Sequence, residues 1–302
     1  FAPRVSSKRR HDKNKDQPKQ EPSFADQSRS KQNPPVAVVV FRDDYAPDSG
    51  YFYFRQNAFS EFNGIKLVRS SNAAFDRDNP DGYPTYTQKE KPAGDNLGIP
   101  AMAYDESAFR SIPTRVAIMT QDFRPFGLSN PVRFWACDNP DPKRFGKAYE
   151  VESRARTIGY KQMFGRKAGD TAWNPEAWAH YLQGPKDPRY KELSDKIIGD
   201  LPADRRGEDF VKAVAIKLWL DDNTTYSLHS PHENSQDPVG DYLFGDRVGY
   251  CVFTSHSACY LFRAAGIPAR IAEGYAVPAT SKGSGSTLLV RSKESHSWPE
   301  LY

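Results

Sequence analysis

The fold of this chain is decided by the stretch GYCVFTSHSACYLFRAAGIPARIAEGY, residues 249–275. Apolar side chains follow Cys251 at helical spacing, which predicts a buried helix that begins at this cysteine. Gly266 supplies a left-handed stop, and Pro268 prevents the helix from continuing. Residues 267–275 then suit an extended strand that enters the core.

The predicted position of Cys251 is typical of a nucleophile. The first N–H groups of a helix lack partners within the helix, and together with the helix dipole they favour an anion such as a thiolate. At helix N-termini the pKa of a cysteine falls to roughly 3.5–7.5. We therefore expect a catalytic Cys251, and the alternative is an inert, buried cysteine.

A nucleophilic cysteine needs a base, and His296 is the candidate. It lies in the segment SHSWPELY, residues 295–302, after a short apolar run. A strand that carries His296 next to an aromatic residue can place the imidazole against the helix tip, as in Cys–His acyl transfer. Trp298 is expected to pack against this imidazole and to shield it from water.

These residues resemble the transglutaminase-like cysteine superfamily. Its two blocks are a G-x-C that opens a helix ending in a GIPAR-type turn, and an HAW-x-E strand, and residues 249–251, 263–270 and 296–300 match them in order and spacing. The resemblance implies an α+β fold with a papain-like core and catalysis by Cys251 and His296. Looser likeness upstream points to the bacterial membrane-anchored transglutaminase-like proteins, on the extracytoplasmic side of the cell envelope.

Two features depart from the family pattern. Ser297 stands where the family has alanine. The third catalytic residue, usually an aspartate after the histidine motif, would lie beyond Tyr302, so we expect a fragment that is truncated at its C-terminal end and could be inactive by itself. Glu300 is expected to make a structural contact rather than to replace that aspartate.

The pattern of the sequence divides the chain into four parts. Residues 1–35 are polar and basic, which predicts a disordered linker. Short strands with polar connections predict an antiparallel sandwich or barrel over residues 36–153. Residues 154–189 form a connecting segment. Helical spacing then begins the transglutaminase-like core, residues 190–302, incomplete at its C-terminus.

Composition excludes several classes of function. The net charge is +4, and the basic tract near the N-terminus lacks interleaved aromatic residues, so no nucleic-acid partner is expected. The three cysteines are not spaced as zinc ligands, and we expect no metal and no cofactor. Cys137 and Cys259 could form one disulfide, although Cys259 is explained most simply as a buried apolar residue. A membrane anchor is expected outside this fragment, because no apolar run reaches roughly 18 residues.

The other histidines and Arg270 are expected to be structural. His180 lies in a predicted short helix, and His256 lies five residues into the cysteine helix and projects away from Cys251, on the helix surface or in packing contacts. His229 and His232 lie in a polar loop. Arg270 ends the GIPAR turn and is expected to fasten it.

The expected function is thiol-dependent acyl transfer or hydrolysis on the amides of a protein or peptide substrate. Resolution of the thioester by water gives a peptidase or deamidase, and resolution by an amine gives cross-linking. The alternative is a non-catalytic envelope scaffold whose β-rich half binds an envelope partner. A papain-type endopeptidase is disfavoured because only 45 residues separate Cys251 from His296.

Overall fold

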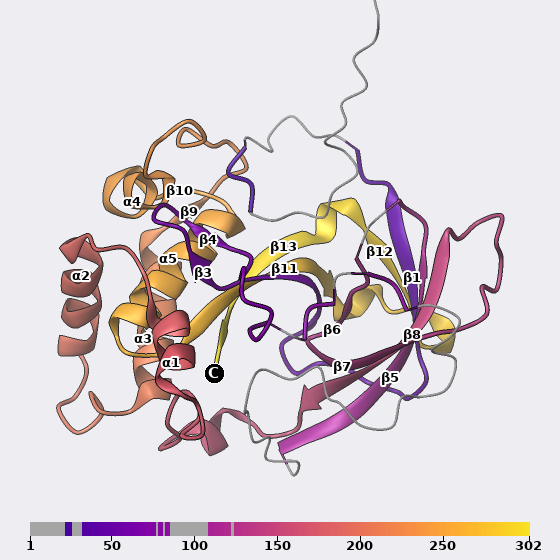
Figure 1. The fold of residues 1–302 in the computed structure, drawn as a ribbon, viewed down its shortest axis with the longest axis horizontal. Helices are drawn as coiled ribbons and strands as arrows, with labels where there is room; N and C mark the ends of the chain where they lie inside the picture. The colour runs from indigo at the N-terminus through magenta and orange to yellow at the C-terminus, as the bar shows by residue number, and fades with distance from the viewer. Residues whose placement is uncertain (1–21, 26–31, 77, 81, 85–107, 122–123) are drawn as a thin grey trace, which may run out of the picture.

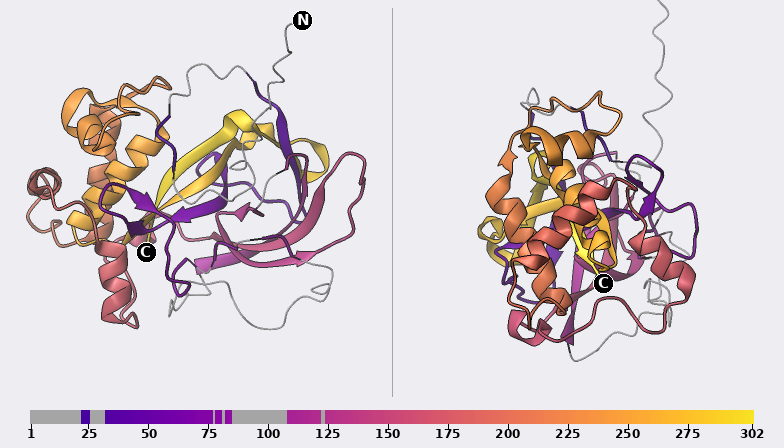
Figure 2. Two further views of the ribbon diagram at one scale, coloured as in Figure 1. Left: turned by 45° about the horizontal axis from the view of Figure 1, so that its top comes forward. Right: turned by 90° about the vertical axis from the view of Figure 1, so that its left-hand side faces the viewer.

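The computed structural model describes residues 22–25, 32–76, 78–80, 82–84, 108–121 and 124–302 of the chain. Strands from both halves of the sequence form two antiparallel sheets (Figure 1). Helices gather at one end of the molecule, and the larger sheet lies at the other end (Figure 2). The α+β class predicted from the sequence is therefore confirmed.

The larger sheet has five strands in the order β12-β1-β5-β8-β7. These strands are β1 Pro35–Phe41, β5 Phe109–Ile118, β7 Asn130–Ala136, β8 Lys147–Arg156 and β12 Thr287–Arg291. Four of them come from the predicted β-rich region, but β12 comes from the C-terminal region and pairs with β1, with Leu289 opposite Val38.

The smaller sheet has four strands in the order β13-β11-β2-β6. They are β2 Tyr51–Phe59, β6 Gly127–Leu128, β11 Ala269–Pro278 and β13 Ser295–Leu301. Two short pairs complete the strands, namely β3 Glu61–Phe62 with β4 Leu67–Val68, and β9 Thr225–Tyr226 with β10 Val248–Gly249. Asn63 and Gly64 lie in the turn that joins β3 to β4, and Gly64 has the positive φ of 102° that favours glycine.

The helices are α1 Pro175–Leu182, α2 Pro188–Gly199, α3 Asp209–Asn223, α4 Pro238–Asp241 and α5 Cys251–Ala264. Local sequence explains where they begin: the side chains of Asn174 and Asp187 accept hydrogen bonds from the first turns of α1 and α2, and a proline follows each of them. Gly266, with a φ of 80°, stops α5 as predicted.

Two apolar clusters meet along β11. One surrounds α5 and includes Phe253, Leu261 and Ile271. The other fills the space between the two sheets and includes Phe54 and Val277. Strand β11 contributes Ile271 to the first cluster and Val277 to the second. Each cluster therefore contains residues from both sides of the domain boundaries predicted near residues 153 and 190. Those boundaries stay a prediction.

Part of the predicted N-terminal linker packs against the helical cluster. Phe24 is only 7% exposed, and its ring lies 4.9 Å from that of Phe253 and 5.1 Å from that of His256, measured between centroids. The Tyr250 hydroxyl donates to main-chain carbonyls on both sides of Phe24. Residues 22–25 are therefore ordered by apolar and hydrogen-bonded contacts that the composition of the segment does not reveal.

Candidate active site

Cys251 is the first residue of α5, as the sequence predicts. Gly249, two residues before it, is tightly packed: a Cβ atom there would lie 3.0 Å from the rings of Tyr242 and Phe253. In the described structure the side chain of Tyr250, the N-cap residue, does not cap the helix. The N–H groups of the first turn can therefore stabilise a negative charge beside Cys251.

Strand β13 holds its backbone against this helix tip. The main-chain N–H of Ser297 lies close enough to the Cys251 thiol to favour its ionised form. The Ser297 hydroxyl lies 2.9 Å from that of Ser255, and the Ser255 hydroxyl donates to the carbonyl of Val252 in the first turn of α5. The serine that replaces the family's alanine thus adds a buried hydrogen bond between the strand and the cysteine helix.

His296 is next to Ser297 on β13, and its ring lies on the other face of the strand. Its imidazole is half-buried, 6.3 Å from the Tyr53 ring and 6.3 Å from the nearly parallel Trp298 ring. Among the described contacts of this imidazole there is no hydrogen bond to the Cys251 thiol. The structure therefore brings the two predicted residues to neighbouring positions, through the Ser297 backbone, without direct contact.

Gly274, opposite His296 on β11, permits this arrangement. A Cβ atom at this position would lie 1.8 Å from the carbonyl oxygen of Phe54 on β2. The register of β11 against β2 also shifts between Glu273 and Gly274. The close approach of the β11 and β2 backbones therefore explains the glycine at position 274.

Electrostatics overturn one expectation about Cys251. Burial raises the pKa of its thiol to about 11, which outweighs the opposite effect of the Ser297 main chain, and the charge of Glu273 acts in the same direction as burial. Burial lowers the pKa of His296. Near neutral pH the structure therefore holds a neutral thiol beside a neutral imidazole, and the expectation of a low cysteine pKa at the helix tip is wrong because desolvation dominates.

Glu273 was not singled out from the sequence. It lies opposite Ser297 on β11 and is only 8% exposed. The available signal was the alternation of side chains along a strand, because paired residues such as Glu273 and Ser297 lie on the same face of the sheet.

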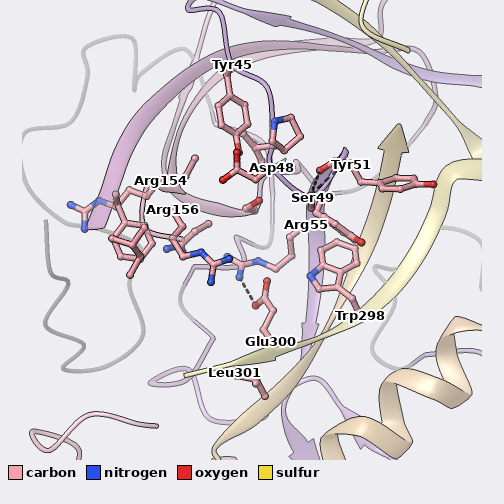
Figure 3. Close-up of a pocket in the computed structure, with 18 of the residues that line it drawn as sticks. Tyr45, Asp48, Ser49, Tyr51, Arg55, Arg154, Arg156, Trp298, Glu300 and Leu301 are labelled. Carbon is pink, nitrogen blue, oxygen red and sulfur yellow. Dashed lines mark hydrogen bonds and ion pairs between the residues drawn. The ribbon is translucent and has the colours of Figure 1, made fainter. Parts of the chain in front are cut away.

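At the other end of β13, a buried ionic network fixes the GIPAR turn. Arg270 is only 1% exposed, and its guanidinium donates to Asp76, to both oxygens of Asp78 and to Glu300 at 2.6–2.9 Å. Arg55 on β2 also donates to Asp78 and, at 2.7 Å, to Glu300, as Figure 3 shows for Glu300. Arg270 and Glu300 are structural, as expected, and the two aspartates come from a loop whose sequence gave no signal of this role.

The other histidines also have structural partners. His180 stacks on Phe75 at 4.1 Å and lies within hydrogen-bond distance of Ser60. His256 is fully buried, so the prediction of packing is confirmed and that of a surface position is wrong. His232 contacts Asp246 at 2.9 Å.

The cysteines and carboxylates show no further site. All three cysteines are free, so Cys137 and Cys259 do not form a disulfide, and Cys259 is buried as predicted. Among the described residues, no group of three histidines, cysteines or carboxylates is placed to hold a metal ion.

Comparison with known proteins relates the part of the chain that carries this site to a known family. Residues 193–302 match the family model described as the transglutaminase-like superfamily. These residues form a transglutaminase-like domain. A protein-glutamine gamma-glutamyltransferase of Pseudomonas aeruginosa is 30% identical over 116 residues, and the uncharacterized protein YebA of Bacillus subtilis is 34% identical over 130 residues.

These relatives match only part of this chain. The alignments cover 38% and 40% of this chain but only 16% and 17% of the relatives' own lengths. The fold of the whole chain is similar to the periplasmic domain of TgpA from Pseudomonas aeruginosa, with a TM-score of 0.58, 19% identity, and coverage of 92% of this chain and 86% of that one. None of the described helices has both the length and the hydropathy that a membrane crossing needs.

Proposed function

We propose that Cys251 and His296 catalyse acyl transfer from the amide groups of a protein or peptide substrate. The observation that carries this proposal is the position of the Cys251 thiol, at an uncapped helix tip and close to the main chain of Ser297, the strand residue beside His296. The match of residues 193–302 to the transglutaminase-like family model, and the 30% identity of part of the chain to a protein-glutamine gamma-glutamyltransferase, support glutamine side chains as the acyl donors.

The neutral pair sets the order of proton transfers. His296 accepts the thiol proton as Sγ of Cys251 attacks the amide carbonyl, which requires the imidazole to turn towards the thiol when substrate is present. The oxyanion then faces the N–H groups at the start of α5. The imidazolium returns the proton to the departing ammonia or amine, which leaves a thioester on Cys251.

The second half of the reaction decides the product. Attack on the thioester by a primary amine gives a cross-link, and attack by water gives a carboxylate. In either case His296 takes a proton from the attacking group and gives it back to the Cys251 sulfur. Glu300 does not orient His296, since it is committed to Arg55 and Arg270.

The likeness to a periplasmic domain supports an extracytoplasmic site of action, and we extend the proposal to a protein anchored in the bacterial envelope. The rival function is that of a non-catalytic scaffold. The high pKa of Cys251 and the missing contact between thiol and imidazole favour this rival, so the experiment must separate the two.

The test uses the full-length protein with a glutamine peptide and a fluorescent primary amine, and it measures both ammonia release and amine incorporation. Catalysis predicts that Cys251→Ala abolishes both signals and that His296→Ala strongly reduces them, whereas Cys137→Ala, which removes a free thiol in the β-rich half, leaves them unchanged. A protein that folds but releases no ammonia above the Cys251→Ala background would leave the scaffold as the function.

A further inference from the structure

A cavity of about 570 Å³ opens between β13 and the strands of the N-terminal half. Trp298, Glu300 and Leu301 of β13 form one wall, and residues of β2, of the loop before β2 and of the end of β8 form the others (Figure 3). This volume is in the range of small-molecule and peptide side-chain sites. The cavity is therefore large enough to take several side chains of a substrate segment.

Exposed apolar side chains gather around this cavity. Tyr51 is 46% exposed, Tyr160 is 64% exposed and Leu301 is 41% exposed, and all three line it. Tyr53 and Trp298 form a contact pair on the β13 side, with ring centroids 5.0 Å apart. Aromatic side chains that surround a cavity and remain open to solvent are typical of a binding site.

The charge of the cavity favours an anion. Four arginines line it against three carboxylates. Arg55 and Arg270 are neutralised in the buried network, and the exposed arginine of the cavity is Arg156, at the end of β8. Figure 3 shows Arg154 and Arg156 across the cavity from Trp298, with Arg55 between these two arginines and the tryptophan. Arg156 is exposed, and its guanidinium lies 5.4 Å from the centre of the Tyr160 ring.

The cavity and the candidate base share one face of β13. Alternation along the strand places His296, Trp298 and Glu300 on the same side, and the last two line the cavity. Trp298 and Glu300 are roughly 7 and 13 Å from His296 along the strand, at about 3.3 Å per residue. A peptide that fills the cavity therefore reaches the imidazole within two to four residues.

We propose that this cavity binds the acyl-donor segment of the substrate and selects a segment with an acidic residue two to four positions from the reactive glutamine. The acidic side chain is held by Arg156, and apolar parts of the segment contact Tyr51 and Trp298. This assignment rests on the proposed function for the identity of the reacting group, whereas binding itself does not need catalysis.

Binding is measured by fluorescence anisotropy with the Cys251→Ala variant of the full-length protein. Three labelled peptides each contain one glutamine and differ at one position, three residues away, which is glutamate, alanine or lysine. A fourth peptide carries the glutamate eight residues away. We expect the first peptide to bind roughly tenfold more tightly than the other three, the order of one charge-assisted hydrogen bond.

The variants connect this preference to the cavity. Adding Arg156→Gln should remove the preference for glutamate, and Arg156→Lys should retain most of it. The matched control is Arg189→Gln, an exposed, ion-paired arginine on α2, which should leave the preference intact. Tyr51→Ser should weaken the binding of the glutamate and alanine peptides to the same extent, roughly fivefold, because it removes apolar contact area and no charge.

The outcomes separate this proposal from the proposed function. Equal binding of the glutamate and alanine peptides, or equal effects of Arg156→Gln and Arg189→Gln, would overturn the acidic selectivity even if the native protein releases ammonia. A preference that depends on Arg156, combined with no ammonia release and no amine incorporation, would support the cavity assignment and overturn acyl transfer.

Discussion

The two ends of β13 hold their ionisable side chains in opposite states. At one end Glu300 joins Arg55, Arg270 and Asp78 in a buried network in which the charged groups are paired. At the other end His296 lies beside Cys251 with both groups neutral and no hydrogen bond between them among the described contacts. Paired charges fix one geometry, whereas a neutral pair keeps the freedom to transfer a proton. Stability and reactivity are therefore separated along one strand by about four residues.

The largest effect on stability is expected when the centre of the network is removed. Arg270→Met leaves Asp78 and Glu300 with less compensation in a site that is almost closed to water, and the expected loss is about 3–5 kcal/mol in the free energy of unfolding. Chemical denaturation followed by circular dichroism measures it. The matched control is Arg115→Met, which removes a half-exposed arginine from its ion pair with Glu150 and should cost about 1 kcal/mol or less, because Glu150 keeps its bonds to Arg42 and Trp135. Similar losses for the two variants would show that the network does not fix the turn.

The reactive end should show the reverse behaviour. His296→Ala is expected to reduce acyl transfer by roughly 10²–10⁴-fold, the range for a general base. It should change the free energy of unfolding by about 1 kcal/mol or less, because the imidazole is half-buried with ring contacts only. Steady-state rates and denaturation curves on the same samples give both numbers. A large loss of stability with a small loss of rate would make His296 structural.

The pH dependence of the rate should reveal the neutral pair. His296 acts as a base only when it is unprotonated, and burial lowers its pKa below the ordinary value of 6.5. The rate should therefore persist as the pH falls to 6.5 and decline only below it. A rate that already falls between pH 8 and pH 7 would indicate that the pKa of the histidine base is raised, and would contradict the effect of burial on His296.

Stability should respond to acid at the network end. Burial by itself would raise the pKa of Asp78, but Arg270 and Arg55 hold it at about 2, below the ordinary value of 3.8. A depressed carboxyl pKa contributes stability that is fully present above pH 3.8 and is lost as the pH falls through about 2. The expected contribution is about 2 kcal/mol. Denaturation curves between pH 5 and pH 2 should lose this contribution, and Asp78→Asn, already destabilised, should lose less over the same range.

The sequence was most informative where local chemistry decides the structure. Gly266, Pro268 and the apolar spacing after Cys251 predicted the cysteine helix and its end, and the GIPAR block located Arg270. Contacts between distant segments were out of reach: the partners of Arg270 come from a loop near residue 76, and β12 leaves the predicted core to pair with β1. The pKa of Cys251 also depends on burial by β13, which no local pattern reports.

The smallest effect concerns the serine that departs from the family pattern. Ser297→Ala removes the 2.9 Å contact with Ser255, leaves the buried Ser255 hydroxyl with its bond to Val252, and keeps the main-chain N–H that reaches Cys251. We expect a loss of about 1 kcal/mol in stability and little change in rate. Ser255→Ala should cost a similar amount, and the double variant should cost less than the sum, because each single change breaks the same bond. Additive losses would show that the two hydroxyls are independent. A rate loss that follows the stability loss would show that this bond, and not the backbone of β13 alone, positions the thiol for His296.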